Sequence, residues 1–187
     1  MNWKQWLEKW GMTSLKINAP YLEMEFKPQD NDRNAAWELY VEMLTRITTQ
    51  PLKDEHGDEQ TALNSIHSLF YTTRTILKKY PPNPNILQIS QKTFGKNLFP
   101  NNREIKNNKQ TDCTEFSKIA IVVLNQVIRP FTAKWHKLSL ENCFSNPEQC
   151  QVFRKELADL QIELRKYTKM LADMAGVEDL TDLENND

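Results

Sequence analysis

Glycine is scarce in this chain, at only four of 187 residues. Four glycines are too few for the glycine-rich loops that cradle phosphates in nucleotide-binding proteins, and no such motif is found. The scarcity also argues against a fold built on many tight turns, and so favours helix over sheet. Motifs typical of zinc proteases and serine hydrolases are missing as well. The sequence therefore predicts no bound metal and no cofactor.

Cysteine, long apolar runs and excess charge are limited too. The three cysteines form no C-x-x-C pair, and so small and odd a number argues against a secreted disulfide scaffold. The longest apolar run covers residues 119–124, against the roughly 20 residues that a membrane span needs. With 24 basic against 25 acidic residues, the chain lacks the basic excess of a dedicated nucleic-acid binder. We expect a cytoplasmic protein with no membrane span.

Apolar residues recur at helical spacing through most of the chain. The pattern predicts helices over residues 2–10, from Asp30 or Asp32 to about 48, over 58–80, from 112 through a kink at Pro130, and from 147 to Gly176. In the second of these, the predicted apolar stripe comprises Trp37, Tyr40, Val41, Leu44 and Ile47. The helix after Asn146-Pro147 carries the most regular rhythm, from Phe153 to Met174, which fits internal packing or a dimer seam.

A short segment near the N-terminus alternates with period two instead. Residues 15–17 and 22–26 place apolar side chains at every second position, and Asn18-Ala19-Pro20 between them offers turn chemistry. This pattern predicts a β-hairpin. The expected fold is therefore a single domain, residues 1–187, of mainly α class: a four-to-five-helix bundle with a small N-terminal β-hairpin. Residues 81–110 read as a long Asn-, Pro- and Lys-rich loop, and residues 177–187 as a frayed acidic tail.

Three tryptophans lie on one face of the first helix, at Trp3, Trp6 and Trp10. Nine residues are too few to hold a helix in water alone, so this face must dock on something. Two interpretations remain open. The helix is a lid on the bundle, or its tryptophans bind a partner protein or a membrane surface.

The segment around Pro130 carries the most suggestive chemistry. Arg129 and His136 are seven residues apart, or two helical turns, so both face the same way if the kink is mild. Histidine can move a proton near neutral pH, and arginine can hold a phosphate. Their R-x6-H spacing resembles the R-x4-6-H motif of the HEPN superfamily of helical-bundle proteins. That resemblance implies a metal-independent ribonuclease of a defence or toxin system, with Arg129 and His136 as catalytic pair at a dimer interface. Residues 128–136 are also similar to segments of small bacterial proteins. A structural role for both side chains is the competing interpretation.

Other polar residues give weaker signals. His67 is expected to be a partly buried polar residue beside Phe70. His136, Cys143 and Cys150 are evenly spaced, but a helix start lies between the two cysteines, so we predict no metal site there. The loop supplies nucleic-acid-binding candidates: Lys92, Lys96, Arg103, Lys106 and Lys109, with Phe94 and Phe99 available to stack on bases.

Three functions follow from the sequence. The first is a non-enzymatic bacterial accessory protein that binds another protein, through Trp3, Trp6 and Trp10 or the basic loop. The second is the HEPN-like ribonuclease, as a homodimer. The third is an RNA-binding module without catalysis.

Overall fold

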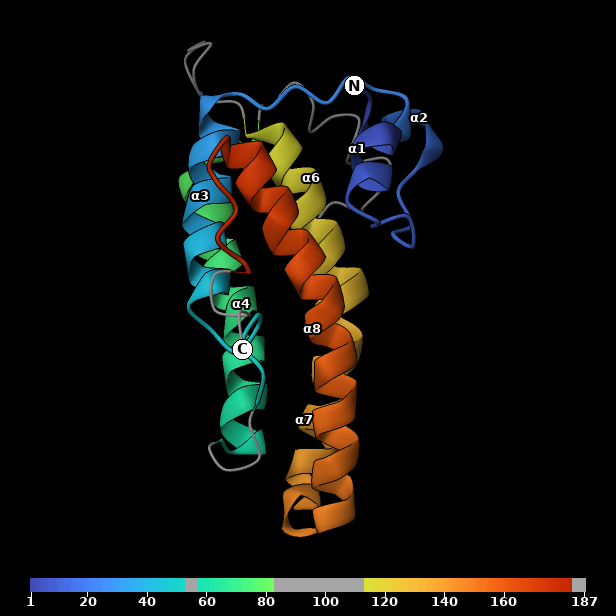
Figure 1. Cartoon of the computed structure of the whole chain (residues 1–187), viewed down its shortest axis with the longest axis vertical. Helices are drawn as coiled ribbons and strands as arrows, with labels where there is room; N and C mark the ends of the chain where they lie inside the picture. Colours follow the sequence, from blue (N-terminus) through green and yellow to red (C-terminus); the bar gives the residue numbers. More distant parts are fainter. Residues whose placement is uncertain (53–56, 83–112, 183–187) are drawn as a thin grey trace.

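The computed structural model describes residues 1–52, 57–82 and 113–182 of the chain. Its helices are α1 (Trp3–Lys9), α2 (Ala19–Leu22), α3 (Asp30–Leu44), α4 (Glu59–Lys79), α6 (Thr114–Val123), α7 (Arg129–Leu140) and α8 (Pro147–Ala175), with a π-helix η1 (Leu124–Ile128) and a 3-10 turn η2 (Cys143–Ser145). Helix α8 runs almost the full length of the molecule, and α1 and α2 lie at the end opposite η2 (Figure 1). The mainly helical fold is confirmed. None of the described helices combines the length and the apolar character that crossing a bilayer requires.

The predicted N-terminal β-hairpin is wrong, because the described residues form no strands. Residues 19–22 form the short helix α2, with Pro20 in its first turn, where the fixed φ of proline suits a helix. The segment that should form the second strand pairs instead with the chain start, through Trp3 N–H to the Met24 carbonyl (3.0 Å) and Phe26 N–H to the Met1 carbonyl (3.0 Å). Both backbone groups of Lys16 bond to the Gln126 side chain, each at 2.8 Å.

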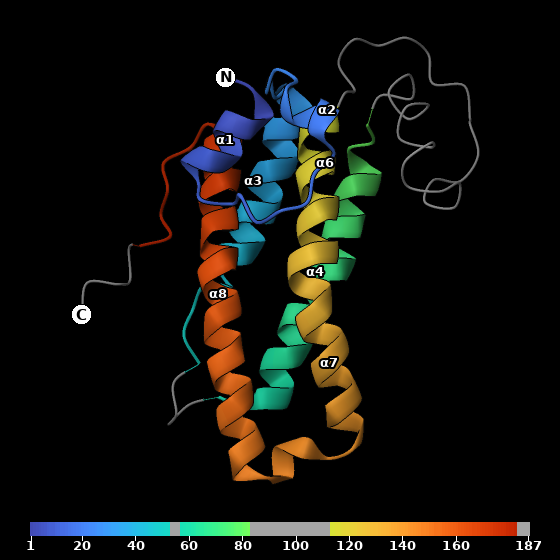
Figure 2. The ribbon, with the colours of Figure 1, turned by 90° about the vertical axis from the view of Figure 1, so that its right-hand side faces the viewer.

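The central seam of the bundle is the inner face of α8. All seven apolar residues of its predicted rhythm are buried: Phe153, Leu157, Leu160, Leu164, Tyr167, Leu171 and Met174. The predicted ends are confirmed, since the Asn146 side chain accepts the Glu148 N–H at 2.9 Å and Gly176 closes the helix with φ +73°. The rhythm therefore serves packing within the chain. Figure 2, turned by 90°, shows α3 and α6 beside α8 at the α1 end of the bundle.

Helix α3 differs from its prediction. It ends at Leu44, and its buried apolar residues are Ala35, Ala36, Leu39, Tyr40 and Met43. Trp37 and Val41 of the predicted stripe are 46% and 38% exposed. Asp32 is fully buried near its start, and its carboxylate accepts the N–H groups of Gln29 (2.9 Å) and Phe116 (2.8 Å). One carboxylate thus satisfies donors at the beginnings of both α3 and α6.

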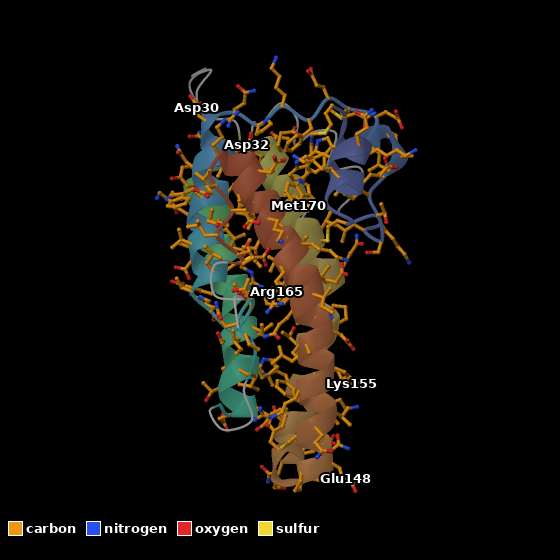
Figure 3. The ribbon with its side chains drawn as sticks, viewed as in Figure 1. Asp30, Asp32, Glu148, Lys155, Arg165 and Met170 are labelled. Carbon is orange, nitrogen blue, oxygen red and sulfur yellow. The ribbon has the colours of Figure 1, made fainter. Side chains whose placement is uncertain are left out.

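Polar side chains of α8 hold the connection between α3 and α4. Gln161 donates to the carbonyls of Ile47 and Gln50, and Arg165 donates to the Thr49 carbonyl at 2.8 and 3.1 Å. Figure 3 shows Arg165 in the middle of α8, between Lys155 and Met170. Helix α4 starts within one residue of its predicted start at 58, and Asp58 caps it: the Asp58 carboxylate accepts the Thr61 N–H at 2.6 Å.

The tail is ordered as far as it is described. The Leu180 N–H donates to the Tyr40 hydroxyl at 2.7 Å, and Thr181 is buried. Residues 177–182 therefore fold back on α3, which the expectation of a frayed tail did not foresee. The long loop predicted at 81–110 lies outside the described residues, except for its first two.

Candidate functional site

The helix that carries Arg129 and His136 continues through Pro130. Proline has no N–H, and its ring would clash with the carbonyl of the residue four positions earlier in a regular α-helix. The wider π-turn η1 comes directly before it, and α7 then runs on from Arg129. The prediction that the helix continues past Pro130 is confirmed, with the π-turn as the local irregularity. Single π-turns of this kind often mark functional sites.

Arg129 and His136 both point towards α4. The guanidinium carbon of Arg129 lies 5.6 Å from the ring centroid of Phe70, in a cation–π contact. The His136 imidazole meets that of His67 edge to face, with centroids 4.5 Å apart. The two helical turns between Arg129 and His136 therefore leave both against the same neighbouring helix.

Helix α4 adds three residues that the sequence did not single out as a site. His67, Phe70 and Arg74 follow at helical spacing, so they share one side of α4. The Arg74 guanidinium carbon lies 5.9 Å from the Phe70 centroid. We call the surface formed by His67, Phe70, Arg74, Arg129 and His136 the α4/α7 face. His67 is exposed, contrary to the partly buried position expected for it.

Apart from Glu59 in the first turn of α4, neither helix carries a carboxylate. Residues 60–80 and 116–140 contain no Asp or Glu. Two lysines of these segments do pair with carboxylates from other helices, Lys79 with Glu38 and Lys134 with Glu156. This absence of acids is the sequence signal that would have drawn attention to α4.

The two arginines of the α4/α7 face keep most of their donors free. Among the described residues, Arg74 has no hydrogen bond or ion pair, and Arg129 donates only from Nε, to the Asn125 side chain at 3.1 Å. By contrast, Arg46 and Arg165 donate to acceptors within the chain. Free guanidinium groups placed by an aromatic ring can bind a phosphate or another oxyanion.

The surroundings of His136 favour its neutral form. Burial lowers the pKa of its imidazole, and the neighbouring His67 lowers that pKa further. Its Nε2 atom is buried and has no hydrogen-bond partner among the described residues. A neutral imidazole at neutral pH can accept a proton.

Two of the three candidate tryptophans belong to the core. Trp3 and Trp6 are 1% and 0% exposed, and Trp10 is partly buried. The Trp6 indole N–H donates to Asp173 at 2.6 Å and that of Trp10 at 3.3 Å, while Lys9 contacts the other oxygen of that carboxylate at 2.9 Å. The helix therefore sits as a lid on α8, and Trp3 and Trp6 are inaccessible to a partner in this conformation.

The nucleic-acid-binding candidates of the loop cannot be placed. Lys92, Lys96, Arg103, Lys106 and Lys109 all lie outside the described residues. Within the part of the chain that the structure describes, no three His, Cys, Asp or Glu side chains converge in a group that could hold a metal ion.

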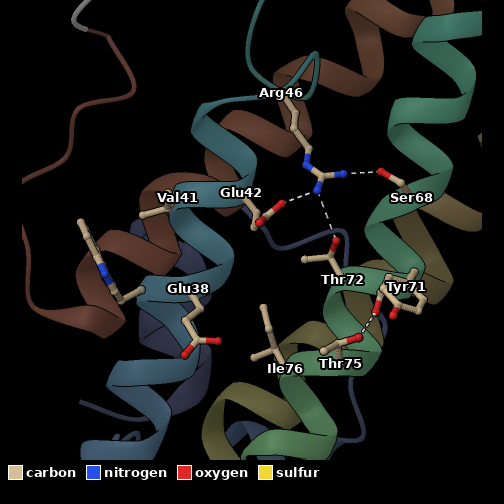
Figure 4. A pocket seen from close by; sticks show the side chains of 10 residues that line it. Glu38, Val41, Glu42, Arg46, Ser68, Tyr71, Thr72, Thr75 and Ile76 are labelled. Atoms are coloured by element: carbon tan, nitrogen blue, oxygen red, sulfur yellow. Dashed lines mark hydrogen bonds and ion pairs between the residues drawn. The ribbon is translucent and has the colours of Figure 1, made fainter.

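A groove of about 630 Å³ lies between α3 and α4. Trp37, Val41 and Tyr71 line it, the last 76% exposed. Figure 4 shows Arg46, just beyond the end of α3, at one end of the groove, bonded to Glu42 on α3 and to Ser68 and Thr72 on α4. The sequence missed this groove because Trp37 and Val41 were expected in the core.

Comparison with known proteins identifies no relative: no family model, curated protein or solved structure matches this sequence.

Proposed function

We propose that this protein binds RNA along the α4/α7 face and cleaves it there without a metal ion. One observation carries the proposal: Arg74 and Arg129 both lie against a single phenyl ring beside two imidazoles in contact, on helices whose only carboxylate is Glu59 in the first turn of α4. Cationic groups of this kind neutralise the RNA backbone. The leading hypothesis from the sequence relied on the three tryptophans or the basic loop as binding surfaces. Two of the tryptophans are buried, and the basic residues of the loop lie outside the described residues.

The chemistry assigned to the two motif residues is the one that the HEPN resemblance implies. Neutral His136 accepts the proton of a ribose 2′-hydroxyl as its oxygen attacks the adjacent phosphorus. The P–O5′ bond breaks, which leaves a 2′,3′-cyclic phosphate on one fragment and a 5′-oxygen on the other that takes up a proton from solvent. Arg129 binds the non-bridging phosphate oxygens and offsets the charge that develops on them. The burial that lowers the pKa of His136 favours the proton-accepting form at neutral pH. A cytoplasmic location suits an RNA ligand.

The test is cleavage of a mixed RNA pool without added metal. Wild type is compared with His136→Ala and Arg129→Ala, and with Lys155→Ala as a matched control, since Lys155 is exposed on α8. Loss of cleavage in the first two variants alone, with unchanged melting temperature, supports the enzyme. Salt-sensitive RNA binding without cleavage would instead support an RNA-binding module. If the protein neither binds nor cleaves RNA, the proposal is refuted.

A second candidate function is a non-enzymatic interaction protein. The groove between α3 and α4 favours it, because exposed Trp37 and Tyr71 are of the types that anchor protein interfaces. Substituting both by alanine would weaken such an interaction and leave RNA cleavage unchanged.

A further inference from the structure

Two histidines from different helices are in contact on the α4/α7 face. His67 of α4 and His136 of α7 meet edge to face, with ring centroids 4.5 Å apart. They are two of the three histidines of the chain, the third being His56. Because His67 and His136 lie far apart in the sequence, no spacing motif reveals the pair.

The imidazole nitrogens of this pair are available as metal ligands. Nε2 of His136 has no hydrogen-bond partner among the described residues. The lowered pKa of His136 favours the deprotonated imidazole, which is the form that binds a metal ion. His67 is exposed, so its ring can rotate to direct a nitrogen at a shared ion.

The separation of the two rings suits coordination of one ion. Two imidazoles on one tetrahedral zinc ion, each at a Zn–N distance of about 2.0–2.1 Å, have ring centroids about 5 Å apart. The observed 4.5 Å is close to this value, and a small rotation of the exposed His67 ring covers the difference. The pair therefore resembles a chelating site before any ion binds.

Both histidines stand on well-packed parts of their helices. Phe70, one turn after His67, is 7% exposed. Trp135, next to His136, is fully buried, and its indole N–H donates to Glu156 at 3.0 Å. Positions fixed in this way lower the entropic cost of bringing two ligands to one ion.

The ligand atoms select the kind of ion. Imidazole nitrogen suits zinc, nickel and copper, whereas magnesium and calcium require oxygen ligands. The one carboxylate of the two helices, Glu59, lies about two turns before His67. Arg74 and Arg129 each lie two turns from the pair, about 10 Å along the helix axis, beyond the Debye length of about 8 Å at physiological salt. Their positive charge is therefore largely screened.

We propose that His67 and His136 together bind one divalent transition-metal ion of the zinc class, with water completing its coordination shell. The ion then occupies the nitrogen with which His136 would accept a proton, so it blocks RNA cleavage. The metal site is independent of RNA, whereas the block rests on the proposed function.

The first experiment is calorimetric titration of the full chain with zinc chloride at neutral pH. We expect one zinc ion per chain, and binding weakened at least about tenfold in His67→Gln and in His136→Gln. His56→Gln is the matched control and should bind zinc as wild type does. Melting temperatures without metal check that the variants are folded, and saturating zinc should raise that of wild type.

Cobalt(II) in place of zinc identifies the ligand atoms. Cys143 and Cys150 are free thiols, and a thiolate is a competing ligand for such ions. A cobalt–thiolate charge-transfer band would overturn the assignment to the two histidines. Wild-type affinity in both histidine variants, or a wild type that binds no zinc, would overturn it equally.

The second experiment measures RNA cleavage with and without zinc, and divides the activity of each protein by its own activity without zinc. Wild type should lose most of its activity once zinc exceeds the measured Kd, and a chelator should restore it. His67→Gln should keep a larger fraction at the same zinc concentration. Equal fractional inhibition of both proteins would overturn the block. If no protein cleaves RNA, the proposed function fails, and the calorimetric result still decides the metal site.

Discussion

The Trp6 indole donates its N–H to the carboxylate of Asp173, 167 residues further along the chain, at 2.6 Å. Trp10 and Lys9 contact the same carboxylate, so a single side chain of α8 binds three residues from the N-terminal segment. Burial alone would raise the pKa of Asp173, but the hydrogen bonds from Lys9, Trp6 and Trp10 outweigh it and lower the pKa. Asp173 therefore stays ionised and keeps α1 in place.

Removing this carboxylate should loosen α1. We expect Asp173→Ala to destabilise the protein by about 1–3 kcal/mol, because buried donors lose a charged acceptor. Tryptophan fluorescence should shift to longer wavelength as Trp6 and Trp10 meet water. Asp159→Ala is the control, since Asp159 is exposed on the same helix. An unchanged emission spectrum in Asp173→Ala would show that the lid is held by its apolar face alone.

The His67–His136 contact should make stability depend on pH. The folded pKa of His136 lies below its ordinary value of 6.5, because of burial and of the electrostatic influence of the neighbouring His67. The unfolded chain then binds the proton more readily than the folded chain does. Stability should fall as the pH drops below about 6.5 and through the folded pKa, and the loss should level off below that.

Thermal melting from pH 7.5 to 5 checks this dependence, with wild type beside His136→Gln and His67→Gln. The melting temperature of wild type should decline more steeply than that of either variant. Parallel curves for all three proteins would mean that other groups cause the decline.

The C-terminus of α8 needs a residue in the left-handed backbone conformation. Gly176 has φ +73°, and a Cβ there would also lie 2.9 Å from a guanidinium nitrogen of Arg33, which is the movable end of a long side chain. Gly176→Ala should therefore cost about 1–2 kcal/mol, mostly from the backbone. Gly176→Asn should cost less, because asparagine tolerates this conformation better. Chemical denaturation gives both values, and equal losses would point to steric contact with Arg33 instead.

An aromatic cluster closes the η2 end of the bundle. Phe153 contacts Trp135 edge to face (centroids 5.0 Å apart) and also Phe131 (5.5 Å) and Phe144 (5.1 Å). Phe153→Ala should destabilise the protein by about 3–5 kcal/mol, through lost burial and the cavity left behind. Val152→Ala, at a residue that is 44% exposed, should cost far less. Urea titration measures the stability of both variants. Similar unfolding midpoints would contradict the conclusion that Phe153 is the centre of this aromatic cluster.

Helices with a continuous rhythm could be predicted from the sequence. On α8 every predicted core position is buried, since caps and spacing agree there. Helix α3 was harder because small residues, Ala35 and Ala36, form much of its buried face, while the larger Trp37 looked more like core. The hairpin failed because periodicity cannot tell which backbone a segment will pair with. Residues 24–26 form backbone hydrogen bonds with residues 1–3 at the start of the chain instead.

The candidate site was predictable only in part. The spacing of Arg129 and His136 was visible, and both do face the same helix. That His67, Phe70 and Arg74 lie opposite them depends on how α4 is aligned along α7. Tertiary packing sets that alignment, and no local pattern on either helix encodes it.

The contact between α1 and α8 also has a consequence for how the chain folds during its synthesis. Helix α1 leaves the ribosome long before Asp173, whose carboxylate binds Trp6 and Trp10. Until residue 173 emerges, the indole N–H groups of Trp6 and Trp10 lack this acceptor, and a nascent chain leaves these side chains less well covered. The unfinished protein therefore offers a chaperone a hydrophobic segment that the finished one conceals.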